Sequence, residues 1–424
     1  MNRFAQKGCL IGMNAYQEDR EVLRNLAAQY REIAHLQVQQ TNIANWKRLY
    51  ARKDTKPMLA IDQICWGELN GEEELKCVCQ DPFARELESQ LRVMLYRWKH
   101  FPCDMVFSPY FRLDKRSTNS GIGVETVTQN EEHHENAQSH LYVDNIPDEA
   151  ALEKLHAPVI RYDREASEQR KQRAEEYFGD ILPVRLVGTL LWEAIWDRIT
   201  FTRGAETVLY DLLDRPEFLH DLMKKMVEID LKAIDQYESE NLLEAEGALC
   251  HCVETYSDDL PKPGFDPNHV RAMDCWASGA AQIFSEVSPA MHDEFEIEYM
   301  KPIYARFGLV NYGCCEPLHN KIDIIRKLPN VRTISASPWA NVEIESEAMG
   351  SDFVMARKPN PAFVAFDSMD ETAIRREIRA TLNACRKNNT PVVFVLKDIT
   401  TIRNQPKRLD LWYNIAKSEI EKDF

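Results

Sequence analysis

The chain has 424 residues, of which 44% are hydrophobic and 28% are charged, and its formal net charge at pH 7 is −16. This composition is ordinary for a globular protein, and the acidic balance argues against a surface that binds nucleic acid. The sequence contains no run of about 18 apolar residues that would cross a membrane, and its first residues lack the apolar core of a signal peptide. We therefore expect a cytoplasmic protein.

The eleven cysteines are an odd number spread along the chain, which makes a poor framework for disulfide bonds. We expect reduced thiols, some of which bind a metal. The pairs Cys77/Cys79 and Cys250/Cys252 are spaced too tightly for a Cys-x-x-Cys zinc site.

Hydrophobic periodicity predicts a helical amino-terminal extension over residues 14–53, followed by apolar runs that alternate with helical stretches. Helical stripes occur at 216–226 and 371–386. The polar segment 113–180 predicts an insertion with a long helix near 164–178. Eight strands are predicted at residues 56–62, 103–108, 182–188, 247–253, 307–312, 331–335, 352–355 and 391–396.

This alternation predicts an α/β fold, specifically a (β/α)8 TIM barrel, with the insertion over the barrel mouth. An open doubly wound sheet is the alternative, but it usually begins with a glycine-rich turn, which this sequence lacks. We divide the chain into a helical extension at 1–55 and a barrel at 56–424.

The turn from Asn311 to His319 places two thiols, Cys314 and Cys315, and the carboxylate of Glu316 where a predicted strand ends. In a βα fold the carboxyl ends of the strands carry the chemistry. The alternative is a packing role, because free cysteines are among the most buried residues.

Other candidate residues also follow predicted strands. His251 is a candidate metal ligand or acid–base group, with a hydrogen-bonded core histidine as the alternative. Trp339 follows a Ser-x-Ser turn, and we expect its ring to form an apolar wall of the site beside hydroxyl donors. Lys358 is suited to bind a substrate carboxylate. The full set of predicted substrate-binding residues is Trp66, Tyr110, Tyr256, Ser337, Trp339 and Lys358.

Several segments together resemble the uroporphyrinogen decarboxylase superfamily, from about residue 56 onward. They are Thr202 to Glu206, Leu212 to Phe218, the helix from Ser288-Pro289 to Lys301-Pro302, and Gly313-Cys314, which stands where members carry a His-x-Cys-Gly turn. The resemblance implies a (β/α)8 barrel.

This chain departs from both well-known branches of that superfamily. The porphyrinogen decarboxylases use an arginine-rich motif that residues 56–69 lack, and Pro109 replaces the aspartate that follows their Phe-Ser. The zinc methyltransferases, which move methyl groups between corrinoids and thiols, bind zinc through His-x-Cys and a distant cysteine. Here Tyr312 replaces the histidine, and Lys397-Asp398 stands near the distant cysteine position.

The resemblance nevertheless implies a zinc-dependent methyltransferase that acts with a corrinoid protein or a thiol acceptor. The substitute metal ligands would be His251, Cys314 and Cys315, and Glu316 is a further candidate ligand. Zinc would keep the sulfur bound to it deprotonated. This chain lacks the Asp-x-His-x-x-Gly motif of cobalamin-binding domains, so a partner protein would carry the corrinoid. A small-molecule substrate and a homodimer are also expected.

Two alternatives stay open at this stage. One is a metal-independent lyase or decarboxylase acting on a small acid, with His251, Glu316 and Asp398 as candidate catalytic groups. The other is a barrel that binds a ligand without catalysis.

Overall fold

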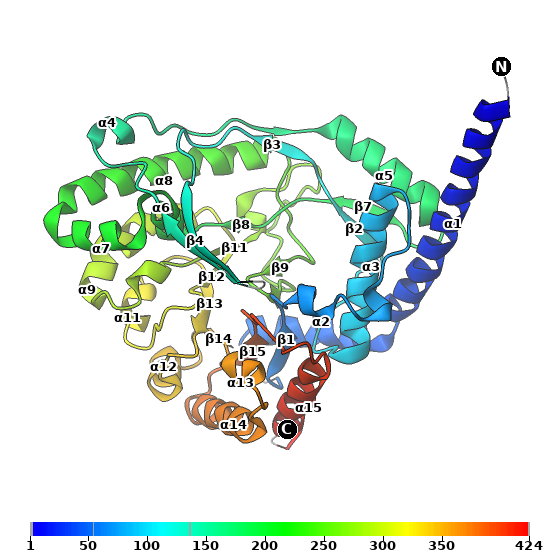
Figure 1. Ribbon diagram of the computed structural model, residues 1–424. Coiled ribbons are helices and arrows are strands. Elements are labelled where there is room, and N and C mark those ends of the chain that lie inside the picture. The colour runs from blue at the N-terminus through cyan, green and yellow to red at the C-terminus, as the bar shows by residue number, and fades with distance from the viewer. Residues whose placement is uncertain (1–2, 54, 135–136, 423–424) are drawn as a thin grey trace.

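A curved sheet of seven parallel strands lies at the centre of the computed structural model (Figure 1). The structure describes residues 3–53, 55–134 and 137–422. In spatial order the strands are β1 (Met58–Ile61), β15 (Val392–Leu396), β14 (Val354–Arg357), β13 (Val331–Ala336), β12 (Leu309–Tyr312), β11 (Trp276–Gly279) and β8 (Leu191–Trp192). Among the described strands, β1 and β8 do not pair with each other. The fold is therefore α/β with a parallel sheet, and the predicted closed barrel is not shown.

Both faces of this sheet are buried, which is why its strands are nearly continuous apolar runs. In β15, Val393 and Val395 join the cluster on the concave face, whereas Phe394 and Leu396 join the cluster beneath the helices. The same alternation holds along β14, where Val354 and Ala356 face inward.

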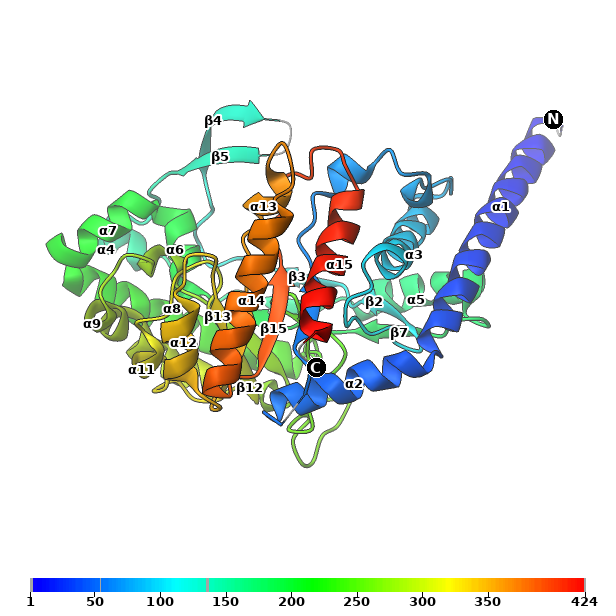
Figure 2. The same ribbon diagram turned by 90° about the horizontal axis from the view of Figure 1, so that it is seen from below.

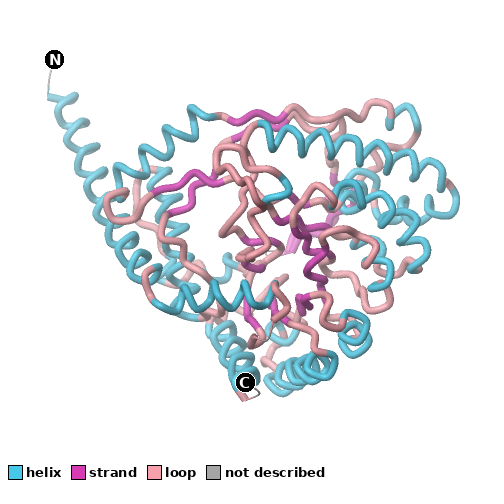
Figure 3. Tube along the Cα trace, turned by 180° about the vertical axis from the view of Figure 1, so that it is seen from behind, coloured by secondary structure: helices cyan, strands magenta, loops and turns pink. Residues whose placement is uncertain are grey.

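Helices cover the convex face (Figure 3). The predicted stripes at 216–226 and 371–386 are confirmed as parts of α8 and α14, and no described helix is long and apolar enough to cross a membrane. The helices after β8 are α6 (Ile195–Arg203), α7 (Ala205–Asp214), α8 (Pro216–Ser239), α9 (Pro289–His292), α10 (Glu298–Tyr304), α11 (Ile322–Ile325), α12 (Val342–Met349), α13 (Ala362–Ala365), α14 (Glu371–Asn388) and α15 (Lys407–Glu421). Short 3₁₀ or π segments are η1 (Trp66–Leu69), η2 (Glu73–Leu75), η3 (Ala272–Asp274), η4 (Gln282–Phe284) and η5 (Asp293–Ile297).

A buried carboxylate joins the last two helices. Glu419 of α15 is 2% exposed and accepts hydrogen bonds from Arg375 and Arg379 of α14 and from Lys422. Burial raises the pKa of Glu419, but these three cationic donors outweigh it and lower the pKa to about 2 from 4.5.

We expect Glu419→Gln to lower the free energy of unfolding by about 2 kcal/mol at pH 7. Because the folded pKa is the lower one, this stabilisation is complete above about pH 4.5 and is lost as the pH falls toward 2. Urea unfolding from pH 7 to pH 3 measures it. Glu421→Gln on the same helix is the control, since Glu421 forms an exposed pair with Lys417, which contributes little to stability. Equal effects of the two substitutions would contradict the prediction.

The helical character predicted for residues 14–53 is confirmed by α1 (Arg3–Ala34), which begins earlier than predicted, and α2 (Gln37–Tyr50). After β1 the chain forms α3 (Pro82–His100). Trp46 and Tyr50 of α2 pack into the cluster on the concave face of the sheet. The helical extension is thus part of the core, and the boundary at residue 55 stays a prediction.

The predicted helix of the insertion is confirmed as α5 (Arg164–Phe178). The rest of the insertion forms β2 (Phe111–Asp114), β3 (Ser117–Asn119), the hairpin β4 (Thr128–His134) and β5 (Ala137–Tyr142), α4 (Glu149–Leu152) and β6 (Ile160–Tyr162). The hairpin stands out on the same side as α13 and the loop after β15, which is the side of the strands' carboxyl ends (Figure 2).

The predicted strand at 103–108 is wrong, because side chains take up the hydrogen bonds that a neighbouring strand would make. Gln39 and Glu254 accept from the backbone N–H groups of Phe107 and Val106. Asn42 and Trp46 of α2 donate to the carbonyls of Met105 and Asp104.

Two further strand predictions are corrected by the structure. Residues 247–253 form a tight antiparallel hairpin of β9 (Leu249–Cys250) and β10 (Val253–Glu254), whose turn residues His251 and Cys252 have φ of 48° and 71°. The run at 182–188 contains β7 (Val184–Val187), but it pairs with β2 outside the main sheet. Strands β8 and β11 take these places in the sheet and were not predicted.

Candidate functional site

Two lysines extend the inward-facing rows of β14 and β15 at their carboxyl ends. Lys358 continues the row of Val354 and Ala356, and Lys397 continues the row of Val393 and Val395. Both side chains are buried, with exposures of 2% and 3%. Residues two apart share a face of a strand, so both lysines lie on the concave face. The apolar side chains of that face are therefore followed, at the carboxyl ends of the strands, by a layer of charged side chains.

The thiol turn begins at Gly313, directly after β12. Gly313 has a φ of 91°, and a Cβ there would lie 2.5 Å from Leu318 Cδ1, so the turn requires glycine. The carboxylate of Glu316 accepts hydrogen bonds from the backbone N–H of Cys314 at 2.9 Å and of Ala281 at 3.4 Å. Burial raises the pKa of Glu316. Glu316 therefore braces the turn, and its predicted catalytic role stays untested.

Four polar groups form a closed ring at this turn, and we call them the thiol–lysine ring: Cys314, Cys315, Lys397 and Asp398. Lys397 Nζ lies 3.2 Å from Cys314 Sγ and 3.0 Å from Asp398 Oδ2. Cys315 Sγ lies 3.5 Å from Cys314 Sγ and 3.3 Å from Asp398 Oδ2. The structure thus brings together Cys314, Cys315 and Asp398, which the sequence predicted as site residues.

The groups of the ring shift the pKa values of its two thiols in opposite directions. The hydrogen bond from Cys315 lowers the pKa of Cys314, and the Lys397 ammonium lowers it further, against the effect of burial. The same hydrogen bond and burial raise the pKa of Cys315. Burial lowers the pKa of Lys397, but the neighbouring sulfurs and Asp398 outweigh this and raise it. Of the two thiols, Cys314 is therefore the one that loses its proton first, beside the ammonium, while Cys315 keeps its proton.

His251 and Cys252 close this layer from the concave side of the sheet. The His251 ring stacks on Trp192 of β8 with centroids 5.0 Å apart, and its Nε2 has no hydrogen-bond partner among the described residues. Burial lowers the pKa of His251, and the charges of Lys358 and Lys397 lower it further. His251 is thus a neutral imidazole near the two lysines.

The remaining predicted site residues are more scattered. Ser337 is fully buried directly after β13, beside Lys358, whereas Trp339 is 72% exposed. Trp66 packs edge-on against Tyr96. Tyr110 accepts a hydrogen bond from Arg185, and Tyr256 belongs to the cluster on the concave face.

Tyr312 points away from the thiol–lysine ring although it lies two residues before Cys314. Its hydroxyl contacts His292 Nε2 at 2.8 Å and donates to Glu296 Oε2 at 3.1 Å, both on the helix side of the sheet. This position therefore does not supply a ligand on the concave face.

The thiol–lysine ring does not fit a zinc centre. Within the described residues, no three His, Cys, Asp or Glu side chains form a group that could hold a metal ion. The Lys397 ammonium contacts both Cys314 Sγ and Asp398 Oδ2, where a metal bound to these two atoms would have to lie. A fixed positive charge already balances the sulfur, and zinc stays a prediction from the sequence alone.

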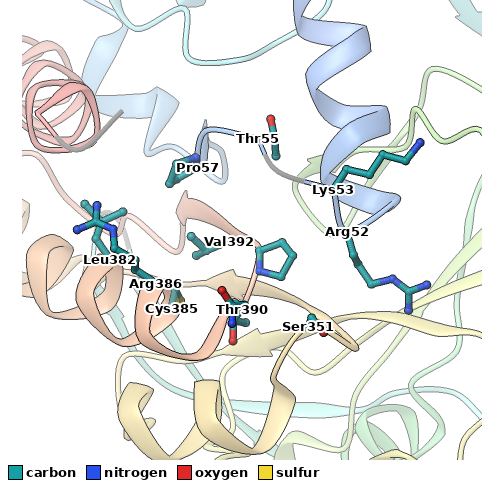
Figure 4. Close-up of a pocket in the computed structure, with 12 residues that line it drawn as sticks. Arg52, Lys53, Thr55, Pro57, Ser351, Leu382, Cys385, Arg386, Thr390 and Val392 are labelled. Atoms are coloured by element: carbon teal, nitrogen blue, oxygen red, sulfur yellow. The ribbon is translucent and has the colours of Figure 1, made fainter.

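Two hollows lie at opposite ends of the sheet. One of about 330 Å³ borders the ring through Asp398 and is also lined by Gln63, Cys65, Gly67, Ile399 and Thr400. The other, of about 380 Å³, lies where β1 and β15 begin, between Arg52, Pro57, Arg386 and Val392 (Figure 4). Of these two, only the first lies at the carboxyl ends of the strands, and it meets the thiol–lysine ring at Asp398.

The sequence prediction missed Lys397, Trp192 and Cys252 as site residues. Lys397 had a usable signal, because it continues the inward alternation of Val393 and Val395 past the end of the clearest strand. Trp192 had none, since β8 is only two residues long.

Comparisons with known proteins leave the family of this chain open. No protein-family model and no curated protein matches it. Among solved structures, a methyltransferase from Methanosarcina mazei is similar with a TM-score of 0.48 and 8% sequence identity, over 90% of this chain and 98% of that one. A likeness this weak does not establish a family or an activity, so the resemblance drawn from sequence motifs stays a prediction.

Proposed function

We propose that the chain is a methyltransferase in which the Cys314 thiolate attacks the methyl group. The contact of 3.2 Å between Lys397 Nζ and Cys314 Sγ supports this most directly. A thiolate is the nucleophilic form of cysteine, and a neighbouring ammonium favours it at neutral pH. The choice of methyl as the group transferred follows the sequence resemblance.

The proposed step forms one bond and breaks one. A lone pair of Cys314 Sγ forms the sulfur–carbon bond while the bond from the methyl carbon to its leaving group breaks, and the leaving group keeps that electron pair. Lys397 protonates a basic leaving group. The resulting thioether needs a stronger nucleophile to take the methyl group onward, and the predicted corrinoid protein would supply one.

Methylation of the intact protein tests this proposal without knowledge of the natural substrate. Methyl 4-nitrobenzenesulfonate is added in limiting amount at pH 7, and peptide mass spectrometry locates the methyl group. We expect Cys314 to react first, although it is only 6% exposed. Cys65 is the internal control, because it is more exposed and burial raises the pKa of its thiol.

We expect Cys314→Ser to remove the fast methylation and leave the slow reaction at Cys65 unchanged. Cys385→Ser, which removes a buried cysteine of α14, is the matched control and should retain it. Faster methylation of Cys65 than of Cys314 in the unaltered protein would overturn the proposed nucleophile.

A further inference from the structure

Lys358 is a buried lysine that has no hydrogen-bond partner for its amine among the described residues. Its backbone N–H donates to the carbonyl of Ala336 at 2.8 Å, which fixes the residue at the carboxyl end of β14. The side chain continues the inward-facing row and is 2% exposed as a residue. The charged and titratable groups that interact with it include Cys252, Lys397, Cys314 and Cys315, and also Cys250 and His251, and none of these is a carboxylate.

Other buried cationic side chains in the described chain have their charge or donors satisfied. Lys397 contacts Asp398, and Lys321 donates to the carbonyl of Phe284. Arg357, the residue before Lys358, points to the other face and pairs with Glu377 at 2.8 Å. Lys358 therefore differs from them in having neither a counter-ion nor an acceptor.

An isolated ammonium is costly to bury, and the charge of Lys397 nearby adds repulsion. Burial is the main cause that lowers the pKa of Lys358; Cys252 acts against it, Lys397 lowers the pKa further, and Cys314 and Cys315 raise it by less. A lysine that is desolvated beside another cation is a better nucleophile, because a larger fraction of its amine is uncharged at neutral pH. The amine lies in the same layer as the thiol–lysine ring but is not part of it.

We propose that Lys358 is an amine nucleophile that forms an imine with a small aldehyde or ketone. The amine lone pair attacks the carbonyl carbon, a carbon–nitrogen double bond replaces the carbon–oxygen bond, and the oxygen leaves as water with the two amine protons. The hydroxyl of Ser337, buried beside Lys358 and without a partner among the described residues, is suited to hold the carbonyl oxygen. This inference does not rest on methyl transfer. It would be a further activity beside the thiol chemistry, since an imine accepts the electrons of a breaking carbon–carbon bond.

Reductive trapping of the intact protein tests this site. Acetone and sodium borohydride are added at pH 7, and peptide mass spectrometry follows the isopropyl group left on each lysine. We expect Lys358 to be labelled roughly 10-fold faster than Lys224, because its lowered pKa leaves a larger fraction of its amine uncharged at pH 7. Lys224 is the internal control, because Asp221 raises its pKa at the surface.

The variants separate this role from the thiol chemistry. Lys358→Met and Lys358→Gln should both lose the fast label while labelling of Lys224 is unchanged, and circular dichroism confirms their folding. Cys314→Ser should retain the Lys358 label, so failure of the methylation test leaves this result intact. Labelling of exposed lysines with Lys358 unmodified in the unaltered protein would overturn the proposal.

Discussion

Replacing Gly188 with alanine is expected to lower the free energy of unfolding by about 3 kcal/mol. Gly188 follows β7, and its backbone lies against residues 242–243, where Thr189 forms a parallel bridge with Leu243. A Cβ on Gly188 would lie 2.2 Å from the Leu243 carbonyl oxygen and 2.5 Å from that of Leu242. Both atoms belong to the backbone, so no side-chain rotation relieves the clash. Urea unfolding followed by circular dichroism measures the loss.

Gly67→Ala is the matched control, because no atom lies within 4 Å of a Cβ at that position and its φ is not in the left-handed region. We expect a change within about 0.5 kcal/mol. If Gly188→Ala unfolds at the same urea concentration as Gly67→Ala, the close backbone approach at Gly188 is not rigid.

Strong periodicity was enough to predict the later part of the sheet. The apolar runs around β12, β13, β14 and β15 were predicted within about two residues of their ends, because each strand is buried on both faces. The helices α5, α8 and α14 also followed from spacing and polarity. These elements are stabilised by residues close in sequence and by a uniform apolar environment. Both conditions produce a regular hydrophobic pattern that can be recognised in the local sequence.

The predicted strand at 56–62 is confirmed as β1, but the next three predicted strands failed for a different physical reason. The run at 103–108 is apolar enough for a strand, but its backbone partners are side chains from α2 and Glu254, which no local pattern reveals. At 247–253, His251 and Cys252 adopt left-handed φ values that residues other than glycine rarely take. Because neither turn residue is glycine, the sequence does not indicate a turn at this position.

The candidate site was predicted in part because its residues follow strands. Cys314, Cys315 and Lys358 were identified from that rule, and Asp398 from its place near the distant cysteine position of the zinc methyltransferases. The ion pair between Lys397 and Cys314 joins residues 83 apart, and it depends on how β12 and β15 are placed in the sheet. Charge balance at a site is a property of the folded layer, which is why the sequence did not indicate the Lys397 ammonium beside Cys314.

Replacing Lys397 with methionine is expected to slow the alkylation of Cys314 by iodoacetamide at pH 7 by about 10-fold. The ammonium is one of the two groups that hold the pKa of Cys314 below its ordinary value of 9.0, together with the hydrogen bond from Cys315. Without it the pKa rises, so the thiolate forms at higher pH and the whole pH–rate profile shifts in that direction. Peptide mass spectrometry of Cys314 between pH 5 and pH 10 measures the profile. Lys397→Arg, which keeps the charge, should retain most of the native reactivity, and Lys417→Met at the surface of α15 should not change it. A Lys397→Met profile that coincides with the native one would show that the ammonium does not stabilise the thiolate.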